Sequence, residues 1–248
     1  MHPNFIKFWG VRDRSSLTGK EYARYGREGI CVEVRYGTTQ LIFGTGSGIR
    51  TLLRDDKNEA LNTHLFISSL DLDLLDGLIH FVTCQAEDTD IGVWVAVPEK
   101  KYLEANADGT ETSGSVKWNA VTHKVNFEPR PSMSISTIFA HGVNGFRVEY
   151  GGQIICHLSI SYPIVTIMPA IIEAAKGADI LIYNQAPDLI HTSWEKAVSL
   201  RDAAEVKLLA LTRHGQECTD TVLDNLSYEA AITARNVVFA RQDMTIAL

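Results

Sequence analysis

The sequence has little basic charge and no long apolar run. Its 23 Lys and Arg residues are outnumbered by 30 Asp and Glu, which gives a net charge of −7, and no basic cluster is longer than a pair. A phosphate backbone attracts proteins through a basic surface, so this balance argues against general nucleic-acid binding. No apolar run approaches the roughly 20 residues that span a bilayer. Residues 1–5 also lack the layout of a secretory signal, so we expect a cytoplasmic protein that does not enter a membrane.

The sequence is also poor in cysteine and in several common catalytic motifs. Its four cysteines are far apart and form no Cys-x-x-Cys pair, which predicts isolated reduced thiols: Cys31, Cys84, Cys156 and Cys218. There is no Gly-x-Ser-x-Gly elbow for a nucleophilic serine. The glycine-rich run 44–48 lacks the spacing of a phosphate-binding loop, so we interpret it as a tight turn after a strand.

What is present is an α/β pattern. A chain of 248 residues with 45% hydrophobic residues can bury one large core. No linker or repeat divides it, which predicts a single domain over residues 1–248. The pattern predicts helices at 49–54, 74–80, 167–176, 193–204 and 219–234, and a helix followed by a loop within 99–114. It predicts strands at 5–9, 30–36, 40–43, 63–67, 91–97, 116–127, 134–139, 146–150, 153–158, 180–183, 206–212 and 236–240.

The most informative stretch is 63–78, where a hydrophobic strand leads into a short polar turn and an apolar helix start. This frame resembles the metallo-β-lactamase superfamily, whose loop at this point reads His-x-His-x-Asp-His. On that pattern Ser69 and Asp71 stand where the first two histidines would be. Asp73 keeps the aspartate, whereas Leu74 replaces the last histidine. The frame of a metal-binding loop is present, but most of its ligands are not.

The resemblance extends over nearly the whole chain. Phe8–Arg12 and Phe43–Arg50 are similar to segments of the ribonuclease-Z-like and phosphodiesterase-like branch. Ile160 stands where a strand of that branch ends in a metal-bridging aspartate. Arg213 stands in place of the last ligand histidine, with His214 beside it. The resemblance implies an α/β fold, a four-layer αββα sandwich, and self-association as a homodimer, which is common in this branch.

Two further histidines stand in segments that the resemblance marks. The segment 141–147 resembles a shortened ligand-bearing loop, in which His141 is a candidate ligand. His191 begins a segment similar to a helix start whose histidine assists proton transfer, which makes it the residual catalytic candidate. It could instead be a capping or packing residue, with Thr192 or Ser193 as the N-cap. The other histidines considered are more typical of structural residues: His80, His157 and His214.

The residues that stand in place of the superfamily's metal ligands determine whether the protein can hold a hydrolytic metal ion. The superfamily uses Zn²⁺-like ions to lower the pKa of a bound water, and each ion needs several His or carboxylate donors within about 2.0–2.2 Å. Leu74 and Ile160 have no lone pairs, and Arg213 adds a permanent positive charge where the cation would sit. We therefore expect no cofactor, and Zn or Mn only in a reduced site. The candidate ligands that remain are Asp71, Asp73 and His141.

Three interpretations of the two aspartates stay open. Asp71 and Asp73 could form a solvated turn, with their carboxylates favourable at a helix start. They could hold one metal ion weakly. Alternatively, the guanidinium of Arg213 could replace the metal electrostatically and pair with one of them, so that no carboxylate is left as an uncompensated charge.

The leading hypothesis is a catalytically inactive metallo-β-lactamase-fold protein that acts as a ligand-binding or regulatory module. It would bind a small anionic ligand, such as a nucleotide or phosphate ester, through Arg213 and either Arg12 or Arg14, or bind a protein partner. One alternative is a phosphodiesterase-like, metal-dependent hydrolase with a reduced, atypical metal site. Another is a scaffold whose old pocket is filled by side chains. The expected ligand-binding pocket comprises Asp71, Asp73, His141, His191, Arg213 and His214.

Overall fold

The protein divides into two compact units, each built around one seven-stranded sheet. The computed structural model describes residues 4–13, 17–55, 61–68, 77–78, 80–81, 90–96, 115–121, 126–140, 142–161, 167–185 and 190–248. Unit 1 contains residues 1–18, 26–122 and 241–248, and unit 2 contains residues 19–25 and 123–240. Because each unit is assembled from separated stretches, the chain passes between them several times.

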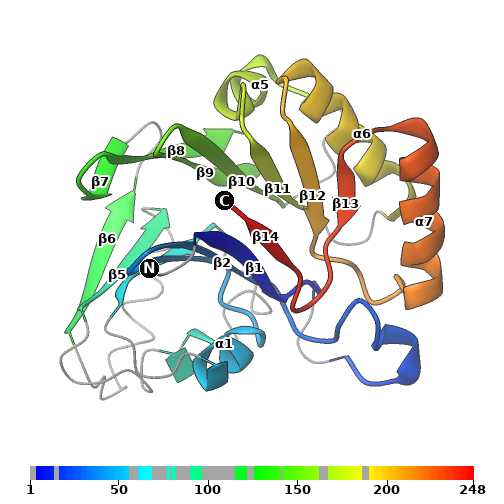
Figure 1. The fold of residues 1–248 in the computed structure, drawn as a ribbon, viewed down its shortest axis with the longest axis horizontal. Coiled ribbons are helices and arrows are strands. Elements are labelled where there is room, and N and C mark those ends of the chain that lie inside the picture. Colours follow the sequence, from blue (N-terminus) through cyan, green and yellow to red (C-terminus); the bar gives the residue numbers. More distant parts are fainter. Residues whose placement is uncertain are drawn as a thin grey trace. The chain divides into compact units, whose positions relative to one another are not determined.

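Unit 1 carries a mixed sheet with the strand order β14-β1-β2-β3-β4-β5-β6 (Figure 1). Its strands are β1 (Phe5–Gly10), β2 (Cys31–Tyr36), β3 (Thr39–Phe43), β4 (Asn62–Ile67), β5 (Asp90–Ala96), β6 (Ser115–Val121) and β14 (Thr245–Ala247). Strands β14, β1, β2 and β3 pair antiparallel, whereas β3 to β6 pair parallel. Gly37 lies in the turn between β2 and β3 with φ +61°, a conformation that glycine adopts without strain.

One face of the unit 1 sheet packs against helix α1 (Ile49–Asp55). Period-two alternation places Trp9, Cys31 and Ile42 on this face, where they are buried with Ile49 and Leu52 of the helix. Every residue of β2 is buried. The polar residues of that strand are therefore inside the protein, although alternation alone predicts an exposed polar face.

Unit 2 carries the second mixed sheet, in the order β13-β12-β11-β10-β9-β8-β7. Its strands are β7 (Asn126–Arg130), β8 (Met133–Ala140), β9 (Val143–Tyr150), β10 (Gln153–Ile160), β11 (Ile180–Asn184), β12 (Leu208–Thr212) and β13 (Val237–Phe239). Strands β7 to β10 form an antiparallel meander, and β10 to β13 are parallel. Helices connect the parallel strands, as such crossovers require.

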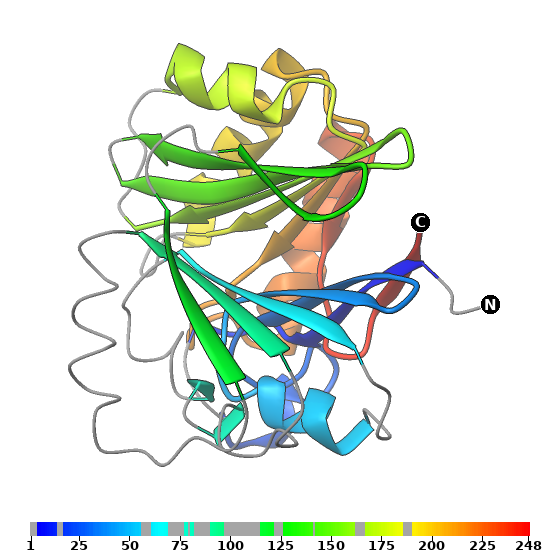
Figure 2. The same cartoon turned by 90° about the vertical axis from the view of Figure 1, so that its left-hand side faces the viewer.

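The three connecting helices of unit 2 cover the same face of its sheet. They are α5 (Pro169–Ala175), α6 (Ile190–Ala203) and α7 (Asp220–Thr233). Figure 2 shows α5 and α6 lying along the sheet. Side chains from all three helices join Leu158, Leu181 and Leu209 of the strands in one buried cluster. This apolar cluster is what positions the ends of the parallel strands.

The strand predicted over 116–127 is wrong as a single element. It is two strands in different sheets, β6 in unit 1 and β7 in unit 2, and Pro129 lies within β7. Proline lacks a backbone donor, so it is tolerated here because β7 is the edge strand of its sheet and has a register shift between Phe127 and Arg130. A continuous strand-like pattern contains no signal that the chain changes sheet.

Two local predictions near the candidate site are also wrong. Helix α6 begins at Ile190, so His191, Thr192 and Ser193 lie in the helix and neither hydroxyl residue is its N-cap. Local cap signals locate a helix start only to within a few residues, because Ser and Thr also occur inside the first turn. Residues Val143–Arg147 form part of β9, not a loop, because its pairing with β10 continues to Val143 opposite Ile160.

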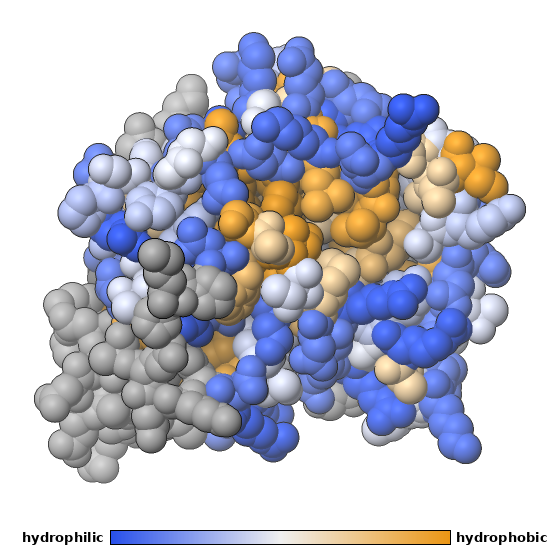
Figure 3. All heavy atoms as spheres, viewed as in Figure 1, coloured by the Kyte–Doolittle hydropathy of each residue, from blue (hydrophilic) through white to orange (hydrophobic). Residues whose placement is uncertain are grey.

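The surface of unit 2 includes one exposed apolar pair. Tyr228 and Ile232 lie one turn apart on α7 and are the large hydrophobic side chains that remain exposed in the described part of the chain. Apolar spheres are visible over the C-terminal end of α7 in Figure 3. None of the helices that the structure describes combines the length and apolarity needed to cross a bilayer.

Candidate functional site

The carboxyl ends of the parallel strands of unit 2 meet at one edge of its sheet. Ser159 pairs with Asn184, and Asn184 pairs with Thr212, so these strand ends are in register. Binding sites of open α/β sheets occur at this edge. Ile160 and Arg213 stand at two positions where the resemblance expects metal ligands, and they directly follow Ser159 and Thr212.

The structure brings Arg213 to the end of β10. Its guanidinium Nη1 donates to the carbonyl oxygen of Ile160 at 3.4 Å, and the residue is only 4% exposed. The backbone of Arg213 has φ +62°. This left-handed conformation is uncommon for a residue other than glycine, and such conformations cluster at functional sites. A buried positive charge therefore lies between the ends of β10 and β12.

The chemistry of these two residues does not fit a hydrolytic cation. Ile160 is buried in the apolar cluster of unit 2 and has no donor atom. Arg213 cannot ligate a cation and repels one. No group of three or more His, Cys, Asp or Glu residues in the described part of the chain is arranged to hold a metal ion. Asp71, Asp73 and His141 lie outside the described residues, as do Ser69 and Leu74.

His214 fixes the loop that carries Arg213. Its buried ring meets Tyr25 edge-on at 6.1 Å and stacks on Phe239 at the same centroid distance. Its Nε2 donates to the carbonyl oxygen of Ala240 at 2.9 Å. These contacts are those of a structural histidine, whereas a role in ligand binding remains a prediction.

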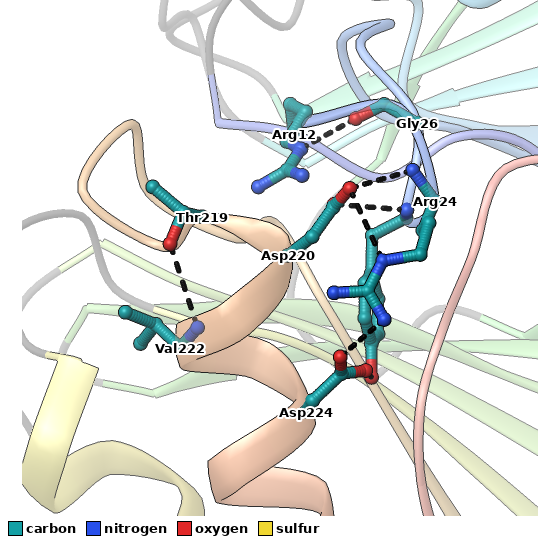
Figure 4. Close-up of polar contacts among 8 residues, drawn as sticks. Arg12, Arg24, Gly26, Thr219, Asp220, Val222 and Asp224 are labelled. Carbon is teal, nitrogen blue, oxygen red and sulfur yellow. Dashed lines mark hydrogen bonds and ion pairs between the residues drawn. The ribbon is translucent and has the colours of Figure 1, made fainter. Parts of the chain in front are cut away.

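The start of α7 binds the segment that contains Tyr25, and Figure 4 shows Asp220 and Asp224 pointing toward Arg24. Buried Asp220 accepts from the backbone N–H of Arg24 at 2.7 Å and of Tyr25 at 3.1 Å. The Arg24 guanidinium forms ion pairs with Asp220 and Asp224, and the Thr219 hydroxyl caps the helix. Sequence reasoning missed Asp220. Its Thr-Asp start signals the helix, but nothing in it identifies backbone partners so distant in the chain.

The other predicted residues are placed as follows. His191 lies in the first turn of α6, directly after the connection from β11, and its side chain is outside the described part. Arg12 is in unit 1, fully buried, and its Nε donates to the Gly26 carbonyl oxygen at 2.7 Å. Arg14 lies outside the described residues.

The glycine-rich run 44–48 is a tight turn, as the sequence predicts. The N–H groups of Gly44, Gly46 and Gly48 donate to backbone carbonyl oxygens of unit 1 at 2.9–3.3 Å. The Ser47 hydroxyl accepts from the Gly29 N–H at 2.8 Å and donates to Glu28 at 2.6 Å. Because these amides already have backbone acceptors, the turn does not present them to a phosphate.

Cys156 and His157 are neighbours in β10 but face opposite sides of the sheet. Cys156 belongs to the helix-side cluster, where burial raises its thiol pKa to about 12. Burial lowers the pKa of His157 to about 3. In unit 1, burial lowers the pKa of His64 to about 4, and Trp94 donates its indole N–H to Nδ1 of that ring at 3.2 Å.

These two histidines are expected to make the protein less stable in acid. The unfolded chain binds a proton at each below about pH 6.5, whereas the folded protein does not until about pH 3–4. Their contribution is therefore complete above pH 6.5 and is lost as the pH falls. Between pH 7 and pH 5 each should remove about 2 kcal/mol from the free energy of unfolding. Urea denaturation of wild type and His157→Leu measures this: the variant should lose about 2 kcal/mol less than wild type over that interval, and equal losses would contradict it.

Comparison with known proteins places these features in a common fold. No protein-family model and no curated protein sequence matches the chain. The metallo-β-lactamase fold protein YhfI from Bacillus subtilis superposes with TM-score 0.75 at 16% identity, over 99% of both chains. A diphosphatase of the PhnP family superposes with TM-score 0.77 at 13% identity, over 99% of this chain and 98% of that one. The short form of human tRNase Z superposes with TM-score 0.70 at 17% identity, over 98% of each.

Identities this low establish the fold alone. The matches extend over essentially the whole of each chain, and the architecture agrees with them: two mixed sheets flanked by helices, in the predicted class. The chain therefore has the metallo-β-lactamase fold.

Proposed function

We propose that the protein binds a small anionic ligand, such as a nucleotide or a phosphate ester, and acts as a ligand-binding or regulatory module without metal-dependent hydrolysis. The anion would bind at the carboxyl ends of β10 and β12, against Arg213. His191 and the aspartates Asp71 and Asp73 complete the pocket in this proposal. The pairing of one aspartate with Arg213 in the ligand-free protein is one of the three interpretations that stay open.

The observation that carries the proposal is the position of the Arg213 guanidinium on the Ile160 carbonyl oxygen. In the metallo-β-lactamase pattern these two positions supply an aspartate and a histidine, which attract a cation. Here they supply an aliphatic side chain and a buried positive charge, which favour an anion. A guanidinium suits a phosphate or carboxylate because its fork of donors can bind two oxygens at once.

Arg213→Gln tests the proposal. It removes the charge but keeps a polar side chain, and a hydrogen bond to a charged group contributes about 1.5–3 kcal/mol, which corresponds to a roughly 10- to 150-fold weaker affinity. We expect isothermal titration calorimetry to show this loss for adenosine 5′-monophosphate, with a smaller loss for Arg213→Lys.

A guanidinium elsewhere in the same sheet provides the control. Arg130 on β7 lies over the Tyr150 ring at 4.7 Å, so Arg130→Gln removes one positive charge far along the sheet from the strand ends. Its affinity for the nucleotide should equal that of wild type. If Arg213→Gln, shown to be folded by its circular dichroism, binds as tightly as wild type, Arg213 is not the anion-binding group.

A metal-dependent, phosphodiesterase-like hydrolase is the second candidate function. It is favoured by the fold shared with the PhnP-family diphosphatase and by the three candidate ligands, Asp71, Asp73 and His141, that remain in the sequence. Metal analysis after dialysis distinguishes the two functions. Stoichiometric Zn or Mn together with turnover of bis-p-nitrophenyl phosphate would overturn the proposal of a binding module.

A further inference from the structure

A row of polar side chains crosses unit 2 directly beside Arg213. Its members occupy four neighbouring strands, β9 to β12, and are paired in register: Asn144, Ser159, Asn184 and Thr212. We call these four residues the polar row. Thr212 precedes Arg213, and Ser159 precedes Ile160, whose carbonyl oxygen accepts from the Arg213 guanidinium. The row therefore lies next to the proposed anion site.

The polar row lies on the sheet face opposite the helices. The chain neighbours Val143, Leu158, Tyr183 and Leu211 all belong to the helix-side cluster. Because successive side chains of a strand point to opposite faces, the row faces the other way. The row is therefore not needed to complete the helix-side core.

Two members of the polar row carry buried polar atoms that have no partner in the part of the chain that the structure describes. Ser159 is 0% exposed and Asn184 is 1% exposed. The Thr212 hydroxyl donates to Oδ1 of Asn184 at 3.3 Å, which leaves Nδ2 of the amide as a donor. Within the described residues neither this Nδ2 nor the Ser159 hydroxyl has a hydrogen-bond partner. Such groups are uncommon in folded proteins, because each costs about 1–3 kcal/mol when left unsatisfied.

We propose that the polar row is the second half of the anion site, and that Ser159 and Asn184 donate to the oxygens of an oxyanion group held by Arg213. This deepens the proposed function and rests on it. The amide Nδ2 only donates and the guanidinium only donates, so the matching ligand group is one that only accepts. A cation or an apolar group would leave these donors unsatisfied. Phosphate esters and carboxylates share the required chemistry.

The test measures binding of inorganic phosphate by calorimetry, with chloride at the same ionic strength as the reference. Ser159→Ala removes the hydroxyl without adding volume, and Asn184→Leu removes the amide at similar size. We expect each to weaken phosphate binding about tenfold, the loss of one hydrogen bond to a charged group. Ser134→Ala, on β8 near the opposite end of the sheet, is the matched control and should bind as wild type.

Titrations with further ligands identify which class of compound supplies the oxyanion. Adenosine 5′-monophosphate against adenosine tests a phosphate ester, and acetate tests a carboxylate. If wild type binds the phosphate ester or the carboxylate, Ser159→Ala should bind that ligand more weakly. The melting temperature of ligand-free Ser159→Ala should not fall, because an unpartnered buried hydroxyl contributes nothing to folding. If Asn184→Leu does not fold, the phosphate affinity of Ser159→Ala alone tests the role of the polar row.

The outcomes separate this inference from the proposed function. If Arg213→Gln abolishes phosphate binding while Ser159→Ala and Asn184→Leu bind within twofold of wild type, the proposed function stands and the polar row holds ordered water only. If wild type binds no phosphate, ester or carboxylate, both are wrong. A tenfold loss in Ser159→Ala with an unchanged Ser134→Ala supports both.

Discussion

Replacing Glu33 with alanine is expected to destabilise the protein by about 3–5 kcal/mol, the usual result of breaking a buried ion pair by removing one partner. Glu33 lies in the middle of the unit 1 sheet and is 0% exposed. Its Oε1 accepts from Nε of Arg35 at 2.6 Å, and the same guanidinium completes an ion pair with it.

Two neutral donors also depend on this carboxylate. The indole N–H of Trp9 donates to Oε2 of Glu33 at 2.8 Å, and the side-chain amide of Gln40 donates to Oε1 at 2.9 Å. The Thr63 hydroxyl in turn donates to Oε1 of Gln40 at 2.9 Å, so the network crosses β1 to β4. Without Glu33, a buried guanidinium and two donors lose their acceptor together.

Urea denaturation of Glu33→Ala provides the measurement, and Asp55→Ala is the control from the same unit. Asp55 pairs with Lys7 at 3.2 Å, but its side chain is 63% exposed, so its loss should cost at most about 1 kcal/mol. The double variant Glu33→Met with Arg35→Met removes both charges and should recover much of the lost stability. A Glu33→Ala variant as stable as Asp55→Ala would show that the network contributes little.

The fold was largely predictable because local patterns determine most of its elements. The β9–β10 hairpin has a Gly-Gly turn between two alternating segments, and α7 has a Thr cap before an amphipathic run. The three-residue β14 was not predicted, since its pairing with β1 depends on partners at the other end of the chain. The change of sheet between β6 and β7 leaves no mark in the hydrophobic pattern.

The candidate site was predictable only where the resemblance marked it. The resemblance marks Ile160 and Arg213 separately, and the structure places the Arg213 guanidinium on the Ile160 carbonyl oxygen. Nothing in the sequence marks Glu33 as buried, because alternation cannot show that α1 covers that side of the sheet. Asp220 was missed because its acceptor role depends on the backbone of Arg24, 196 residues away in the chain. Polar partners of this kind are set by tertiary structure.

Glycines let three backbone segments of unit 1 approach closely, and Gly10→Ala tests how much this contributes to stability. A Cβ at Gly10 would lie 1.9 Å from the Gly29 carbonyl oxygen and 2.9 Å from that of Glu28. A Cβ at Gly48 would lie 2.8 Å from both the Gly10 nitrogen and the Gly29 oxygen. Three backbone segments therefore meet with no room for a side chain, and none of them can move without breaking its hydrogen bonds.

We expect Gly10→Ala to lower the free energy of unfolding by more than about 3 kcal/mol, because the added methyl meets backbone and not a flexible side chain. Gly37→Ala is the matched control: it has φ +61° but nothing within 4 Å of its Cβ, so only the backbone strain of about 1–2 kcal/mol applies. Chemical denaturation of both variants measures these two losses of unfolding free energy. Equal losses would mean that the close approach at Gly10 relaxes easily. A much larger loss at Gly10 means that the close approach of Gly10, Gly29 and Gly48 contributes strongly to the stability of unit 1.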